Sequence, residues 1–145
     1  VKRIERLIYP VSFYRHKARH VKATCQRLVD VYAGRVPATM EELLTLPGVG
    51  RKTANLVLIL AFKSQHNICV DTHVHRISNR WGYVATKTPE KTEMALRAKL
   101  PKQYWIEYND LLVSFGQHLC RPISPVCSDC PVKKYCRQIG VTTRR

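Results

Sequence analysis

The chain has 145 residues, of which 25 are Lys or Arg and 10 are Asp or Glu, so its formal net charge is +15. An apolar content of 45% is enough to form a buried core. The longest apolar run, Leu56 to Phe62, is far too short to span a bilayer, and no membrane partner is expected. The basic excess favours a polyanionic partner, nucleic acid first, over a solvated basic surface or a place in a ribosome-like assembly.

Apolar residues recur at helical spacing along most of the chain, and no convincing pair of strands, repeat or low-complexity segment interrupts them. We therefore predict an all-α fold. Helix caps and stops set the bounds. The expected helices cover residues 2–8, 14–32, 39–44, 51–62, 71–81, 88–100 and 102–119, followed by a proline- and cysteine-rich loop with a short basic turn at 132–135.

The helix expected at residues 14–32 is amphipathic. Its opposite face is basic, and its apolar stripe contains Ala18, Val21, Cys25, Leu28, Val29 and Tyr32. We expect Cys25 in this stripe, and Cys69 further along the chain, to be buried core residues.

Four of the six cysteines fall in the last 26 residues: Cys120, Cys127, Cys130 and Cys136. Their spacing, C-x6-C-x2-C-x5-C, contains one knuckle that can place two thiolates on the same metal centre. With no export signal in the chain, clustered cysteines favour metal binding over disulfides. Both zinc and a cubane iron–sulfur cluster take four thiolates, and a single knuckle with two flanking cysteines favours the cluster.

The stretch Leu46-Pro-Gly-Val-Gly-Arg-Lys52 joins a short helix to an apolar one. Glycines in such a turn let backbone N–H groups approach a phosphate at the positive end of the following helix. A nucleotide-binding P-loop is excluded, because the pattern G-x4-G-K-[ST] and a preceding strand are both missing. An ordinary glycine-rich helical hairpin remains the alternative.

Two further residues suggest chemistry. Lys52 follows this turn beside Arg51, where neighbouring positive charge favours the neutral, nucleophilic form of an amine. Asp71, in the sequence VDTHVHR, opens a helix after an apolar stretch and can act as a general base or stabilise a developing cation. Taken singly, Lys52 is equally a phosphate contact and Asp71 a helix cap.

The three motifs, in this order and spacing, resemble the endonuclease III branch of the helix–hairpin–helix DNA glycosylases, from about residue 4 to residue 137. The resemblance implies that Lys52 attacks C1′ of a damaged nucleotide, expels the base, forms a Schiff base and cuts the strand 3′ to the lesion by β-elimination. It implies a catalytic role for Asp71, and a [4Fe-4S] cluster held by Cys120, Cys127, Cys130 and Cys136. The substrate is then extruded from the duplex, because C1′ and the damaged base are inaccessible in the stack.

The same resemblance assigns the DNA contacts. The phosphate clamp corresponds to Leu46, Pro47, Gly48, Val49, Gly50 and Arg51. Phe13 corresponds to a wedge inserted into the opposite strand, with a helix-staple or core residue as the alternative. His73 is expected on the rim of the base pocket, with a solvent-facing or capping histidine as the alternative. The loop between the first two cysteines has one cation, Arg121, so DNA contact there is weakly supported.

The resemblance also implies the organisation of the chain. Residues 1–64 are expected to form part of a helical barrel that lacks its N-terminal helices, and residues 65–145 a cluster lobe with its loop at 120–136. The active cleft is expected between the lobes. The predicted function is a bifunctional glycosylase and abasic-site lyase acting on oxidised or ring-saturated pyrimidines in duplex DNA, as an intracellular monomer. The alternatives are a monofunctional glycosylase and a non-catalytic DNA-binding module.

Overall fold

The computed structural model describes all residues of the chain, Val1–Arg145, and contains helices but no β-strand. This confirms the all-α prediction. The chain divides into two compact units, Val1–Phe62 and Lys63–Arg145, each of which is described by itself. None of the helices is both long and apolar enough to cross a membrane.

The first unit is built from four helices: α1 (Lys2–Ile8), α2 (Tyr14–Tyr32), α3 (Met40–Leu43) and α4 (Arg51–Leu60). The residues expected to end α2 and to begin α3 do so. The hydroxyl of Thr39 accepts a hydrogen bond from the backbone N–H of Glu42 and caps α3. Ala33 and Gly34, both left-handed, end α2. The core of this unit consists of Leu43, Leu46, Ala54 and Leu58, with Leu28, Tyr32, Met40, Val49 and Val57 packed against it.

Two expectations about this unit are wrong, one about burial and one about the end of a helix. Cys25 is exposed, and so are Val21 and Val29 of the same stripe. Helical spacing shows which residues share a face, but not whether another element covers that face. The apolar helix α4 likewise ends at Leu60 instead of Phe62, and Leu60 is 59% exposed.

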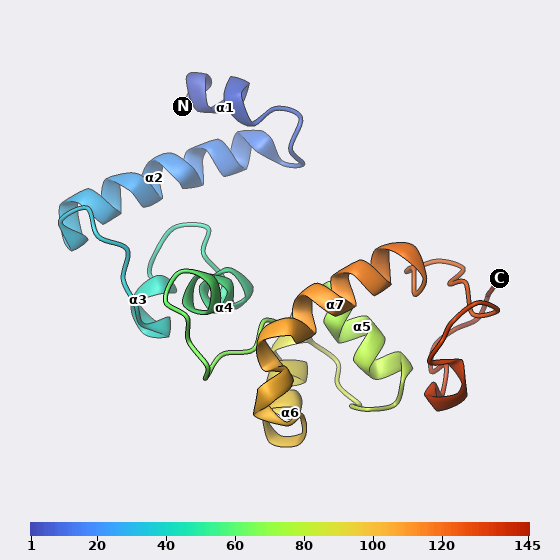
Figure 1. Ribbon diagram of the computed structural model, residues 1–145. Coiled ribbons are helices and arrows are strands. Elements are labelled where there is room, and N and C mark those ends of the chain that lie inside the picture. Colours follow the sequence, from blue (N-terminus) through green and yellow to red (C-terminus); the bar gives the residue numbers. More distant parts are fainter. The chain divides into compact units, whose positions relative to one another are not determined.

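The second unit contains α5 (Thr72–Arg80), α6 (Pro89–Lys99), α7 (Trp105–His118) and two short 3-10 turns, η1 (Lys102–Tyr104) and η2 (Lys133–Tyr135). Both α6 and α7 pack on α5, and Figure 1 shows α7 running alongside it. The helix expected from residue 102 thus begins with a 3-10 turn. The core consists of Ile68, Val70, Val74, Ile77, Val84, Leu96, Trp105 and Leu112.

The polypeptide after α7 is irregular and carries the four clustered cysteines. It is attached to the end of α5 by backbone hydrogen bonds, from Arg137 N–H to the carbonyl of Trp81 (3.5 Å) and from Ile139 N–H to that of Arg80 (3.0 Å). The cysteine loop therefore takes its position from α5.

Candidate functional site

The glycine turn between α3 and α4 is held to the first unit by its own side chains and by α2. Leu46 is buried, and Val49 packs against the same core. The hydroxyl of Thr24 on α2 donates a hydrogen bond to the carbonyl of Pro47 (2.7 Å). Val49 therefore anchors the turn to the core. Leu46 and Val49 thus fix the backbone, and Gly48 and Gly50 are the exposed residues of the turn.

The two glycines have different requirements. Gly48 has φ +77°, and a Cβ there would lie 2.7–2.8 Å from the side chain of His20. Gly50 is the N-cap of α4, with φ −97°, and a Cβ there would meet nothing within 4 Å. Neither glycine N–H donates a hydrogen bond within the chain. The turn therefore offers backbone donors and open space at the positive end of a helix.

Gly48→Ala is expected to lower the free energy of unfolding by about 2–4 kcal/mol, since it combines a left-handed alanine with a clash against α2. Gly50→Ala, the matched control, should change it by less than about 1 kcal/mol. Thermal unfolding of the two variants measures the difference. The opposite order of stabilities would contradict the described turn. Only Gly50→Ala should weaken DNA binding without loss of stability, because its methyl group occupies the space above the amides.

Lys52 lies in the first turn of α4, next to Arg51, and is exposed. The backbone near it is fixed by Ala54, which lies two residues further along α4 and is fully buried. Lys52 therefore presents an exposed amine at the rigid start of a helix, beside a cation. Such an amine can act as a nucleophile or contact a phosphate.

Asp71 begins α5 in the second unit. It follows the buried residues Ile68 to Val70 and is itself 7% exposed. Its Oδ1 accepts hydrogen bonds from the backbone N–H groups of His73 (2.8 Å) and Val74 (2.9 Å). The predicted cap is confirmed, and the two amides fix the orientation of the carboxylate. A catalytic role for Asp71 stays a prediction, as does the cleft between the two lobes.

His73 and Phe13 lie in different surroundings. His73 is half-buried, and its Nδ1 lies 3.1 Å from the guanidinium of Arg76. Phe13 is 79% exposed in a left-handed conformation just before α2. Phe13 is therefore not a core residue, and its role as a wedge stays a prediction.

All four clustered cysteines line one small cavity, together with Arg80 and Trp81 from the end of α5. Backbone and side-chain donors point at two of the sulfurs: Arg80 Nη1 lies 3.4 Å from Cys120 Sγ, and the backbone nitrogen of Gln138 lies 3.3 Å from Cys136 Sγ. Burial, together with the other three sulfurs, raises the pKa of the Cys136 thiol. No group of three or more His, Cys, Asp or Glu side chains is arranged to hold a metal ion. Four thiols around one cavity, with N–H donors at two of the sulfurs, match an iron–sulfur cluster in the type of its ligands, although not in their present arrangement.

Two arginines of α5 are functional candidates that the sequence reasoning missed. Arg80 is 8% exposed and donates to the carbonyls of Arg121 (2.6 Å) and Pro122 (2.7 Å). Arg76 donates to the carbonyl of Cys120 (2.8 Å). Burial, and secondly the charge of Arg80, lower the pKa of Arg76. Both guanidinium groups thus hold the first part of the cysteine loop.

Comparisons with known proteins agree with this arrangement. The family model for HhH-GPD superfamily base excision DNA repair proteins matches residues 1–102. Endonuclease III of Thermotoga maritima is 51% identical over 130 residues, which cover 90% of this chain and 61% of that protein. Endonuclease III-like protein 1 of Mus musculus is 48% identical over 133 residues, which cover 90% of this chain and 44% of that protein.

Two solved structures also match this chain. A trapped endonuclease III–DNA covalent intermediate matches with a TM-score of 0.86 and 39% identity over 94% of this chain and 64% of that one. A thermostable thymine-DNA glycosylase matches with a TM-score of 0.75 and 27% identity over 93% of this chain and 64% of that one. The chain spans less than two thirds of the length of these curated relatives and solved chains. The family model, the identities and the all-α fold with its glycine turn together show that this chain belongs to the HhH-GPD superfamily of base excision DNA repair proteins, in which it is similar to endonuclease III.

Proposed function

We propose that the protein is a bifunctional DNA glycosylase and abasic-site lyase. One observation carries the proposal: Lys52 stands exposed in the first turn of α4, directly after the glycine turn. The chain is 39% identical to an endonuclease III that has been trapped as a covalent intermediate with DNA. A covalent intermediate requires a nucleophile, and Lys52 is the amine that this turn presents.

In this proposal the Lys52 amine attacks C1′ of an extruded nucleotide. The bond between C1′ and the base breaks, the base leaves with the electron pair, and the sugar opens to a Schiff base on the lysine nitrogen. Loss of a proton from C2′ then expels the 3′ phosphate by β-elimination. The substrates are oxidised or ring-saturated pyrimidines and abasic sites in duplex DNA.

Asp71 serves this reaction through its charge. A buried carboxylate held by two amides cannot turn away, so it is suited to stabilise the positive charge that develops at C1′ as the base leaves. His73, anchored to the same cap by its backbone N–H, is then placed to contact the base.

The glycine turn, from Leu46 to Arg51, binds the DNA backbone in this proposal. The N–H groups of Gly48 and Gly50 would donate to a phosphate, Arg51 adds charge, and Phe13 is the wedge. Neutralisation of phosphates by a chain of net charge +15 releases counterions, so binding should weaken steeply with added salt. With DNA as its partner, the protein would act inside the cell, as a monomer.

The four clustered cysteines would hold a [4Fe-4S] cluster. The cluster supplies the cross-link that an irregular segment with few apolar residues needs in order to fold. Arg80 and the N–H of Gln138 would donate to the thiolates of Cys120 and Cys136. The guanidinium charge also offsets part of the negative charge that four thiolates bring.

Borohydride trapping on duplex DNA with a single abasic site tests the function. Borohydride reduces a Schiff base to a stable amine, so a lyase should give a covalent adduct on a denaturing gel, and strand cleavage without borohydride. A protein that releases a ring-saturated pyrimidine but forms no adduct would be a monofunctional glycosylase. One that binds the duplex and does neither would be a non-catalytic module.

A further inference from the structure

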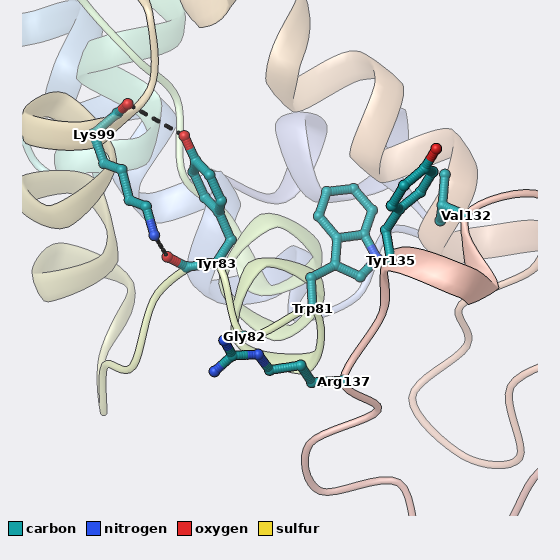
Figure 2. A pocket seen from close by; sticks show the side chains of 7 residues that line it. All are labelled: Trp81, Gly82, Tyr83, Lys99, Val132, Tyr135 and Arg137. Carbon is teal, nitrogen blue, oxygen red and sulfur yellow. Dashed lines mark hydrogen bonds between the residues drawn. The ribbon is translucent and has the colours of Figure 1, made fainter.

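A second cavity lies in the second unit, at the opposite end of α5 from Asp71. Its volume is about 380 Å³, and its walls come from three places (Figure 2). The residues after α5 contribute Trp81, Gly82 and Tyr83, the end of α6 contributes Lys99, and the cysteine loop contributes Tyr135 and Arg137. With about 1.5 Å of rise per residue, the nine-residue helix α5 separates this cavity from Asp71 by about 13 Å. None of its residues takes part in the proposed chemistry.

Aromatic rings form most of the wall. Trp81 is half-buried and packs on Phe115 behind it, with ring centroids 6.0 Å apart. The ring of Tyr83 lies beneath the ammonium group of Lys99, at 4.4 Å. Tyr135 is 73% exposed and stands on the other side of Trp81 in Figure 2. Two fixed rings and one exposed ring suit a flat ligand that stacks.

The charged groups of the cavity are both positive, and no acidic residue lines it. Lys99 is fixed at one side, because its Nζ donates to the carbonyl of Tyr83 (2.6 Å). Arg137 lies below Gly82, where a Cβ would come within 2.5 Å of its Cδ, so the glycine is required for this approach. The Arg137 guanidinium has no hydrogen-bond acceptor within the chain. A ligand that satisfies this cavity is therefore planar at one end and anionic at the other.

We propose that this cavity binds a single unpaired nucleotide, with the base between Trp81 and Tyr135 and the phosphate on Arg137. A volume of about 380 Å³ is at the lower end of the range for small-molecule sites, which fits one nucleotide and not a longer segment. The same chemistry is offered by a free nucleotide and by an unpaired residue of a single strand. In either case the site is additional to the glycine turn.

The cavity depends on the cysteine loop. Tyr135 and Arg137 flank Cys136, and the backbone N–H of Arg137 donates to the carbonyl of Trp81. Tyr135 and Arg137 are therefore in place only when the loop is folded against α5. Binding at the cavity should be lost when the metal centre is removed.

Thymidine monophosphate is the probe, and a ligand-observed NMR titration of the metal-loaded protein is the measurement. Tyr135→Ala should weaken binding about 5- to 100-fold through lost stacking, whereas Tyr135→Phe should bind like the parent. Arg137→Ala should weaken the binding of thymidine monophosphate and make it less sensitive to salt. Thymidine, which has no phosphate, should bind the parent as weakly as thymidine monophosphate binds this variant. Both side chains are exposed, so their truncation leaves the core intact. Lys91→Ala, an exposed cation of α6 outside the cavity, is the matched control and should have no effect.

A parent protein that binds no thymidine monophosphate, or cavity variants that bind as the parent does, would overturn the proposal. If a short oligothymidylate binds the parent much more tightly than thymidine monophosphate does, and the cavity variants lose this binding, the ligand is an unpaired residue of a single strand. Equal affinity for both probes assigns it to the free nucleotide. Abasic-site cleavage should stay at the parent level in every cavity variant, so failure of this site and failure of the proposed function are distinguishable.

Discussion

Lys52→Ala is expected to abolish the borohydride-trapped adduct and to lower the rate of abasic-site cleavage by on the order of 10³-fold or more. The alanine cannot form a Schiff base, and no other group in the first turn of α4 carries an amine. Duplex binding should persist, reduced by about one unit of salt slope if the ammonium also contacts a phosphate. Trapping on an abasic duplex and the salt dependence of affinity, measured on one preparation, give both values.

Lys22→Ala is the matched control, because Lys22 is an exposed lysine of α2 in the same unit. It removes the same charge and should keep the adduct and most of the cleavage rate. An adduct that survives in Lys52→Ala but disappears in another lysine variant would reassign the nucleophile. If Lys52→Ala loses affinity and cleavage in equal proportion, the lysine is a phosphate contact only.

Much of the fold was predictable, because the signals that set helix ends are local. Thr39, Asp71 and Thr88 each cap the helix that the sequence indicates, and Gly34 and Gly82 end α2 and α5 by adopting positive φ. Such signals involve a few neighbouring residues and need no tertiary information. Whether another element covers a helix face depends on tertiary structure, which local signals do not contain. Cys25, for example, is on the apolar stripe of α2 and is nevertheless exposed.

The candidate site shows the same division. The residues that follow a motif were predicted from the sequence, and the four cysteines do surround one cavity. Arg76 and Arg80 were missed because two arginines one helical turn apart usually indicate a solvated face. Their acceptors are carbonyls and a sulfur 40–44 residues away, at Cys120, Arg121 and Pro122. No local pattern predicts such an acceptor.

Arg80→Met is expected to be the most destabilising single change outside the hydrophobic core. Arg80 is buried, and its guanidinium donates to two carbonyls and one sulfur of the cysteine loop. A methionine fills a similar volume but leaves these acceptors without donors, which costs about 3–5 kcal/mol in the free energy of unfolding. The loop that contains the first cysteine would then be released from α5, so the iron content per chain should fall together with the stability.

Two variants separate the hydrogen bonds from the charge. Arg80→Lys keeps the charge, but an ammonium cannot reach both carbonyls in the geometry of a guanidinium, so intermediate stability and iron content are expected. Arg121→Met is the matched control: Arg121 lies in the cysteine loop, donates to one carbonyl, that of Gln117 (3.3 Å), and is exposed. Its loss should cost no more than about 1 kcal/mol. Thermal unfolding and the visible absorbance of the loaded protein measure both effects. If Arg80→Met retains iron and unfolds like Arg121→Met, the cysteine loop is held by its own backbone and not by α5.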